Sequence, residues 1–238
     1  DRFTDKTVKR ESGKTVNLLG LTPLDFSING TAESIRAFLE ANGYTVVSSW
    51  AMGSTLDDIR ESGRAAVNLV VSYAGIPAAK KLKDLFGTPY VTGVPFGKKF
   101  PDTLLKALTD SAADGKDRVP YMGRRPGKEL TLIGESVTSG SLAAALAAEC
   151  GLGVRVLCPL ETEAALLDAG DRIAPDEDDL TPLLRPEDAI VADPLYKPIC
   201  PAGSRFYSLP SESFSGRIFR KEIPNLIGTE IMKGLKRL

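Results

Sequence analysis

The chain has 238 residues, of which 42% are hydrophobic and 26% are charged, and its formal net charge is −1. These values are typical of a globular protein of one or two domains, and they give no general attraction for nucleic acid or for an anionic membrane. The longest apolar runs fall well short of the roughly 20 residues that a membrane helix needs, and the charged start lacks a signal-peptide core. We therefore expect a cytoplasmic protein that binds neither nucleic acid nor a membrane.

Short apolar runs alternate with helix-like segments along the whole chain. The first half predicts strands at 16–20, 44–50, 66–72 and 88–94, with helices beginning near 31, 54, 76 and 101. The second half predicts strands at 129–134, 154–160, 189–193 and 205–209. Its predicted helices run from about 138 to 151, over 161–170, and over 223–238 at the end of the chain. Apolar strands that alternate with helices indicate parallel sheets covered on both faces.

The two halves resemble each other in the order of their landmarks. Gly20 and Gly134 follow the first strand of each half, and Pro95 and Pro210 follow the fourth strand at nearly the same separation. The polar segment 114–127 lies between the halves and predicts a linker. We therefore predict one domain over 1–113 and a second over 128–238. In parallel sheets of this kind a ligand binds beyond the carboxyl ends of the strands, which directs attention to the loops that follow them.

The residue types restrict the chemistry of any site. The chain has no histidine, which excludes the imidazole base and the imidazole metal ligand. Cys150, Cys158 and Cys200 form no CxxC pair, so we interpret them as small apolar side chains and not as a metal or disulfide framework. The residues alone identify no catalytic group.

Several short motifs have two interpretations. GESVTSG (134–140) and AMGSTLDD (51–58) each stand between a strand and a helix, where they form either an anion-binding turn or a capped helix start. Lys98 and Lys99 face either an acidic ligand or solvent, and Lys80, Lys81 and Lys83 form either a solvated face or a contact for an acidic partner. The run DEDD (176–179) is either a divalent-ion site or, as we favour, a solvated acidic segment.

The succession of these pieces resembles the nitrogenase component 1-type oxidoreductases. The similarity is carried by VNLLGLTPLDFSINGTAESIRAFLEANGYTVVSSWAMGSTLDD, by YAGIPAAKKLKDLFGTPYVTGVPFG, and by the later GKELTLIGESVTSG and EDAIVADPLYKPICPAG. The resemblance implies two tandem Rossmann-like, three-layer αβα domains with parallel sheets, similar to the second and third domains of a family subunit. It also implies that the first domain, with its cluster-binding cysteines, is absent and that the chain is a fragment.

Two positions decide whether a nitrogenase-type cofactor is expected. By the family's spacing, the cysteine ligand would stand eight residues before Gly87 of GTPY, where this chain has Ala79. The histidine ligand would stand four residues before Phe214 of FSG, where it has Pro210. Neither side chain coordinates a metal. We therefore expect these residues to bind no metal or other cofactor, and an iron–sulfur cluster to belong to the full-length complex.

The resemblance implies an oxidoreductase subunit that takes electrons from an iron–sulfur ATPase reductase and pairs, as a dimer, with a homologous or identical subunit. A small or tetrapyrrole-like ligand would bind among the loops beyond both sheets. The alternatives are a non-catalytic scaffold for cofactor assembly and a pair of hinged ligand-binding domains. The candidate ligand-pocket residues are Thr22, Pro23, Met52, Gly53, Ser54, Tyr73, Phe96, Gly97, Glu135, Ser136, Thr138 and Asp193.

Overall fold

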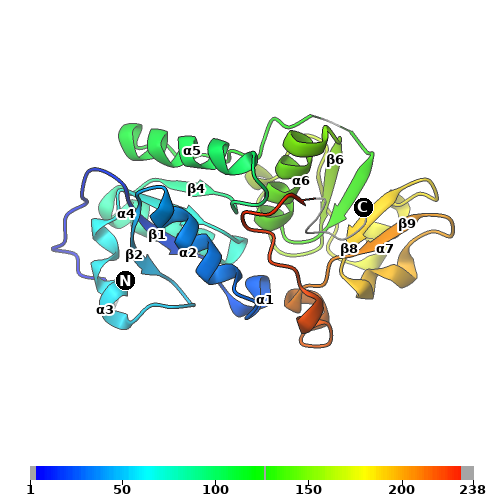
Figure 1. The fold of residues 1–238 in the computed structure, drawn as a ribbon, viewed down its shortest axis with the longest axis horizontal. Coiled ribbons are helices and arrows are strands. Elements are labelled where there is room, and N and C mark those ends of the chain that lie inside the picture. The colour runs from blue at the N-terminus through cyan, green and yellow to red at the C-terminus, as the bar shows by residue number, and fades with distance from the viewer. Residues whose placement is uncertain (1–3, 126, 232–238) are drawn as a thin grey trace.

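The computed structural model describes residues 4–125 and 127–231, which form two parallel β-sheets side by side (Figure 1). The first sheet has the strand order β2-β1-β3-β4, and the second has the order β7-β6-β5-β8-β9. Every pair of neighbouring strands is parallel. The predicted parallel α/β class is therefore confirmed.

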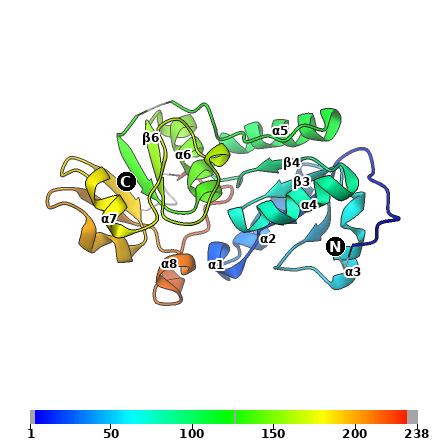
Figure 2. The same ribbon diagram turned by 180° about the vertical axis from the view of Figure 1, so that it is seen from behind.

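The first sheet is built from short, buried, β-branched and aliphatic runs. Its strands are β1 (Thr15–Leu19), β2 (Thr45–Ser49), β3 (Val67–Val70) and β4 (Tyr90–Thr92). Its helices are α1 (Pro23–Phe26), α2 (Thr31–Ala41), α3 (Leu56–Arg60), α4 (Ile76–Phe86) and α5 (Phe100–Asp114). Figure 1 shows α2 in front of the sheet, and Figure 2, seen from behind, shows α4 in front of it. Helices thus cover both faces, as a parallel sheet requires.

The second sheet repeats this plan with one extra edge strand. Its strands are β5 (Leu130–Ile133), β6 (Val154–Cys158), β7 (Arg172–Ile173), β8 (Ala189–Ala192) and β9 (Arg205–Ser208). Its α-helices are α6 (Ser136–Cys150), α7 (Glu177–Leu180) and α8 (Glu212–Ser215). In each sheet the first strand is internal, with the following strand on one side and a later one on the other. Strand β7 was not predicted, because only two residues form it and both are exposed.

Alternation along the strands of the second sheet divides its side chains between two cores. Leu132 and Val191 belong to a large core that continues through α6 and α5 into the first sheet. Ile133 and Ile190, their neighbours in sequence, belong to a smaller core on the opposite face with Leu180. Because successive side chains of a strand point to opposite faces, one face of the second sheet is joined to the first half of the molecule.

One of the predicted helices is wrong, and another is wrong over 223–230, the part before its helical residue Ile231. The segment 161–170 contains only a 3₁₀ turn, Ala164–Leu166. The chain from Ile223 to Glu230 crosses back to the first sheet without forming a helix, and the remainder of that prediction, 232–238, lies outside the described residues. Pro224 and Gly228 weaken a helix there, and the backbone pairs with the first half instead, since the N–H of Gly97 donates to the carbonyl of Leu226 at 3.2 Å.

Smaller differences occur at helix ends. Helix α6 begins at Ser136, two residues earlier than predicted, and α5 reaches Asp114, the first residue of the predicted linker. Helix α2 begins at Thr31, with Gly30 in the cap position, and the hydroxyl of Thr31 donates to the side-chain oxygen of Asn29. No helix in the described ranges combines the length and the apolarity that crossing a bilayer requires.

Candidate functional site

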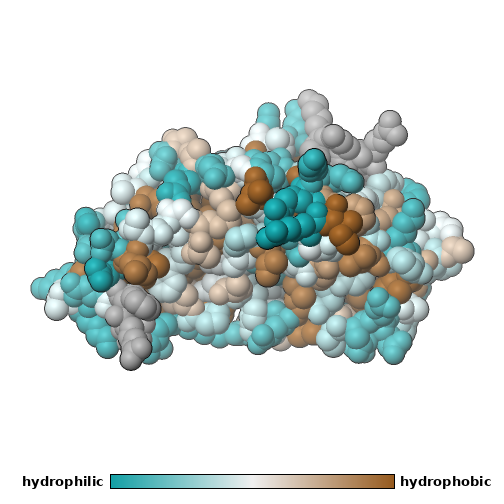
Figure 3. All heavy atoms as spheres, turned by 90° about the horizontal axis from the view of Figure 1, so that it is seen from below, coloured by the Kyte–Doolittle hydropathy of each residue, from teal (hydrophilic) through white to brown (hydrophobic). Residues whose placement is uncertain are grey.

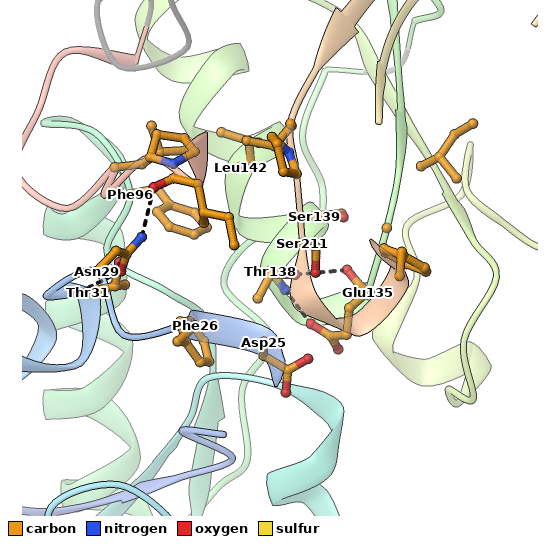
Figure 4. A pocket seen from close by; sticks show the side chains of 18 residues that line it. Asp25, Phe26, Asn29, Thr31, Phe96, Glu135, Thr138, Ser139, Leu142 and Ser211 are labelled. Atoms are coloured by element: carbon orange, nitrogen blue, oxygen red, sulfur yellow. Dashed lines mark hydrogen bonds between the residues drawn. The ribbon is translucent and has the colours of Figure 1, made fainter. Parts of the chain in front are cut away.

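A cavity of about 100 Å³ lies where the carboxyl ends of the two sheets meet. The first half contributes the loop around α1 and the residue Phe96, while the second half contributes the start of α6 and the loop after β9 (Figure 4). The returning segment supplies Ile223, Pro224 and Leu226. The lining is therefore drawn from separate stretches of the chain, and it is largely apolar with a few polar groups, as ligand cavities usually are.

Glu135 is the central polar residue of this cavity. It is the N-cap of α6, and its carboxylate accepts hydrogen bonds from the backbone N–H groups of Val137 (3.0 Å) and Thr138 (2.8 Å). The same carboxylate accepts the N–H of Tyr73, at 2.9 Å, from the loop after β3. Burial raises the pKa of Glu135, while these hydrogen bonds favour its charged form. One side chain thus caps α6 and joins the two halves.

This arrangement decides between the two interpretations of GESVTSG. The N–H groups at the start of α6 would bind an anion only if they were free, but Glu135 occupies them. AMGSTLDD behaves in the same way, because Thr55 and Asp58 form a capping box at the start of α3. Both turns are therefore capped helix starts.

The loop around α1 forms the opposite wall. Thr22 caps α1 and donates to the carboxylate of Asp25 at 2.7 Å, which fixes this carboxylate near the cavity. The side-chain amide of Asn29 donates to the carbonyl of Ile223 at 3.1 Å, so the returning segment is attached to the same loop. Ser27 adopts a positive φ of 56° and donates to Glu212 of α8. This wall is held by contacts between residues that are far apart in sequence.

Three of the twelve candidate residues line the cavity, namely Phe96, Glu135 and Thr138. Asp193 lies behind the lining, where its carboxylate accepts the N–H of Ser211 and the hydroxyl of Ser215, both at 2.8 Å. It therefore holds the loop after β9 in place. The others are absent from the lining: Thr22, Pro23, Met52, Gly53, Ser54, Tyr73, Gly97 and Ser136.

The physical reasons for these eight positions differ. Ser54 accepts the backbone N–H of Ser49 and so closes its own loop, away from the second half. The hydroxyl of Ser136 is engaged by Glu135 and Thr162, and Tyr73 contributes its backbone N–H to Glu135. Five further residues of the lining were not among the candidates: Asp25, Asn29, Ser139, Leu142 and Ser211. Leu142 could have been predicted, because it stands one helical turn after Thr138 and therefore lies on the same face of the helix.

Helix α6 makes two further contacts with the first half. The hydroxyl of Ser141 accepts the buried N–H of Val94 at 2.9 Å, and the carboxylate of Glu149 accepts the N–H of Lys98. The other oxygen of Glu149 accepts the N–H of Ile231 at 3.1 Å. Together with Glu135, these side chains bind two loops of the first half, those after β3 and β4, along the length of one helix. Such contacts oppose a free hinge between the sheets.

The residues at the two expected ligand positions do not fit a metal cofactor. Ala79 is fully buried in the core face of α4, and Pro210 lines the cavity without offering a donor. Burial raises the pKa of all three cysteine thiols, that of Cys158 to about 12, so none is disposed to act as a thiolate ligand. Within 4–125 and 127–231, no three or more His, Cys, Asp or Glu side chains are grouped to hold a metal.

The lysines predicted to form a face of α4 are partly engaged within the chain. Lys80 pairs with Glu163 of the second half, and Lys83 pairs with Asp117. The backbone N–H groups of Lys98 and Lys99 point to Glu149, and the ammonium of Lys99 donates to the carbonyl of Ala148. The contacts of Lys80 and Lys99 place these two basic groups between the halves and away from the cavity.

Comparison with known proteins identifies the family. The description "Nitrogenase component 1 type Oxidoreductase" fits residues 1–129. A subunit of the light-independent protochlorophyllide reductase of Prosthecochloris aestuarii is 34% identical over 133 residues, which is 53% of this chain and 24% of that protein. The nitrogenase molybdenum-iron protein alpha chain of Azospirillum brasilense is 31% identical over 90 residues, 37% of this chain and 18% of that protein.

A solved structure titled "Nitrogenase Cp1 at pH 5" aligns with 76% of this chain and 40% of its own, at 17% identity and a TM-score of 0.44. The chain spans about a quarter of the length of the protochlorophyllide reductase subunits it matches. The family match covers more than half of the 238 residues. The chain therefore belongs to the nitrogenase component 1-type oxidoreductase family.

Proposed function

We propose that the chain forms the ligand-binding part of a nitrogenase-like oxidoreductase subunit. Electrons would come from an ATP-dependent iron–sulfur reductase, through an iron–sulfur cluster held outside these residues, to a ligand in the cavity between the sheets. The observation that carries the proposal is the position of this cavity, at the facing carboxyl ends of two parallel sheets in a chain of this family.

The lining indicates what kind of ligand this cavity accepts. Phe26, Phe96 and Leu142 offer an apolar surface, and Asn29 and Ser211 offer hydrogen-bonding groups. At about 100 Å³, the enclosed space suits a small molecule or one edge of a larger tetrapyrrole-like one. The acidic residues of the lining contribute carboxylates, so the polar end of the ligand is a hydrogen-bond donor.

A partner subunit has an available surface beside this cavity. Leu24, Ile28 and Ile218 are 59%, 68% and 73% exposed, and they lie on the side of the molecule that carries α1 and α8. Figure 3 views this side and shows hydrophobic residues next to hydrophilic ones. Exposed apolar side chains that gather near a cavity favour an interface, which supports pairing with a homologous or identical subunit.

Reconstitution tests the electron-transfer part of this proposal. The full-length protein would be produced without oxygen, together with its partner subunit and its reductase, and ATP-dependent oxidation of the reduced reductase would be followed as small ligands are added. We expect a ligand that accelerates this oxidation and is itself reduced. A complex that contains iron and sulfide but transfers no electrons to any ligand would contradict catalysis.

A scaffold for cofactor assembly is the second candidate. The observation that favours it is the pair Ala79 and Pro210, which leaves the cavity without the donors that hold a cofactor permanently. In that case the same preparation would release its iron and sulfide to an acceptor protein, and no ligand would be reduced.

A further inference from the structure

A second cavity, of about 250 Å³, lies beside the first in the second half of the chain. It is formed by the turns after β6 and β7, by the start of α7 and by the segment after β8. Phe214 of α8 lines both cavities and therefore stands between them. Pro159, Pro175, Leu180 and Leu195 supply the rest of the apolar wall.

Two aromatic rings meet in this second cavity. Tyr196 and Phe214 pack edge to face, with ring centroids 5.3 Å apart and an angle of 75° between the ring planes. In such a pair, each ring retains a face that its partner does not cover. The faces of aromatic rings carry negative electrostatic potential, and they attract cations within about 6 Å of the ring centre.

The charged residues of the second cavity have a single sign. Asp176 and Glu177 line it, and no lysine or arginine is found among the described residues of its wall. The carboxylate of Asp176 caps α7 by accepting the N–H of Asp179 at 2.9 Å, whereas Glu177 is exposed at the mouth. Burial and the charges of Asp193 and Glu177 raise the pKa of Tyr196 to about 12. The phenol therefore stays neutral, and the surrounding potential is negative.

These features together differ from a merely solvated acidic segment. Acidic side chains in the first turn stabilise a helix through its dipole, and that role accounts for the sequence DEDD without any ligand. It does not account for a cavity beside them that is walled by two aromatic rings packed edge to face, two prolines and two leucines. An apolar wall that includes two aromatic rings, with a carboxylate at the mouth, is an arrangement that recognises an organic ammonium ion.

We propose that this second cavity binds an organic ammonium group with a compact apolar body, a quaternary ammonium above all. The cation would lie against the faces of Tyr196 and Phe214, with Glu177 as the opposite charge. This site is separate from the redox function proposed above and does not require it. The shared residue Phe214 places the ammonium site next to the cavity between the sheets.

Three ligands of nearly the same shape test the proposal in the unmodified chain. Choline carries a positive charge, its carbon isostere dimethylbutanol is neutral, and dimethylbutanoate is negative. Titration followed by NMR should show saturable choline binding, with shifts at Tyr196 and Phe214, and binding of the neutral isostere that is weaker by about 5-fold or more. Dimethylbutanoate should not bind. Equal binding of choline and its neutral isostere, or no saturable binding of choline, would overturn the proposal.

Matched variants locate the site. Tyr196→Leu should weaken choline binding by about 10-fold, because it keeps the apolar bulk but removes the ring face. Glu177→Gln should weaken it by about 2- to 5-fold, since the carboxylate is exposed and screened. The controls are Asp178→Asn on the same helix and Tyr207→Leu on β9, neither of which lines the cavity.

Both controls should bind choline as the unmodified chain does. If Asp178→Asn weakened binding as much as Glu177→Gln, the attraction would be a diffuse effect of the acidic segment and the proposed site would be wrong. Melting temperatures would be recorded for every variant. If Tyr196→Leu fails to fold, the comparison of Glu177→Gln with Asp178→Asn and the three-ligand series still decide the outcome.

Discussion

Helices α2 and α6 occupy equivalent places in the two halves, since each lies between the first and second strands of its sheet, but they have different surroundings. Helix α2 is amphipathic, buries four of its eleven residues and has no side-chain cap. Helix α6 has fifteen residues, is buried on nearly all sides and is capped by Glu135. A helix that is apolar all round belongs inside a protein. The repeat in the fold is therefore topological. Helix α6 contacts the first half through Ser141, Glu149 and the large shared core, whereas α2 meets the second half through the hydrogen bond from Asn225 to Ser34.

The largest expected effect is a difference in stability between two variants, each of which loses one serine hydroxyl from α6 or from α2. Ser141→Ala in α6 leaves the buried N–H of Val94 without its acceptor, which should lower the free energy of unfolding by about 1–3 kcal/mol. Ser34→Ala in α2 removes an acceptor for the half-buried side chain of Asn225. The free energy of unfolding should then fall by less than about 1 kcal/mol. Urea unfolding of the three proteins measures both changes.

The same pair of variants tests whether the halves act as one body. In the unmodified chain the unfolding transition should be single, because α6 and the large core are shared between the sheets. Equal effects of the two substitutions, or two separate transitions in the unmodified chain, would show that α6 is an ordinary covering helix.

A smaller effect distinguishes two buried carboxylates, Glu135 and Glu212, by the way in which their contributions to stability depend on pH. Burial raises the pKa of Glu135 above 4.5, so its contribution to stability is complete below that pH and is lost as the pH rises through the raised value. Glu135→Gln cannot titrate. Its stability relative to the unmodified chain should therefore improve as the pH rises from acidic to neutral.

Glu212, which meets Ser27 in the loop before α2, should behave in the opposite way. Its hydrogen bonds with Arg220 lower its pKa, so its contribution is complete above 4.5 and is lost as the pH falls through the lowered value. Glu212→Gln should thus be less stable than the unmodified chain at neutral pH and approach it in acid. Unfolding curves between about pH 2 and pH 8 decide both cases, and parallel slopes for the two variants would contradict the assignments.

The sequence was sufficient for the fold because the strand signals are local. Runs such as VNLL and AIVA are short, apolar and bounded by turn residues, and each became a buried central strand. The end of the chain shows the limit of this reasoning. Ile223, Leu226, Ile227 and Ile231 have helical spacing, but the backbone at Leu226 bonds Gly97, a contact across more than half of the chain. Periodicity cannot reveal such a tertiary contact.

The candidate site was only partly predictable for a related reason. Candidates were selected because they follow a predicted strand. Among them, Glu135, Thr138 and Phe96 line the cavity. The same rule selected Met52, which lies outside the lining. Loops at the same edge of a sheet need not all face the second sheet. Asp193 was selected for its position too, but its carboxylate is occupied by hydrogen bonds within the loop after β9. Only the packing of the two halves separates these cases.

The central claim is that the cavity between the sheets holds the ligand that is reduced, and filling the cavity tests it most directly. Thr138→Phe would be introduced into the reconstituted full-length complex, with Thr181→Phe, an exposed position outside the lining, as the control. We expect Thr138→Phe to lower kcat/KM for the reduced ligand by about 100-fold or more, while the reductase still reduces the iron–sulfur cluster at the normal rate. The control should keep full activity. Unchanged kcat/KM in Thr138→Phe, with the fold intact, would contradict the claim.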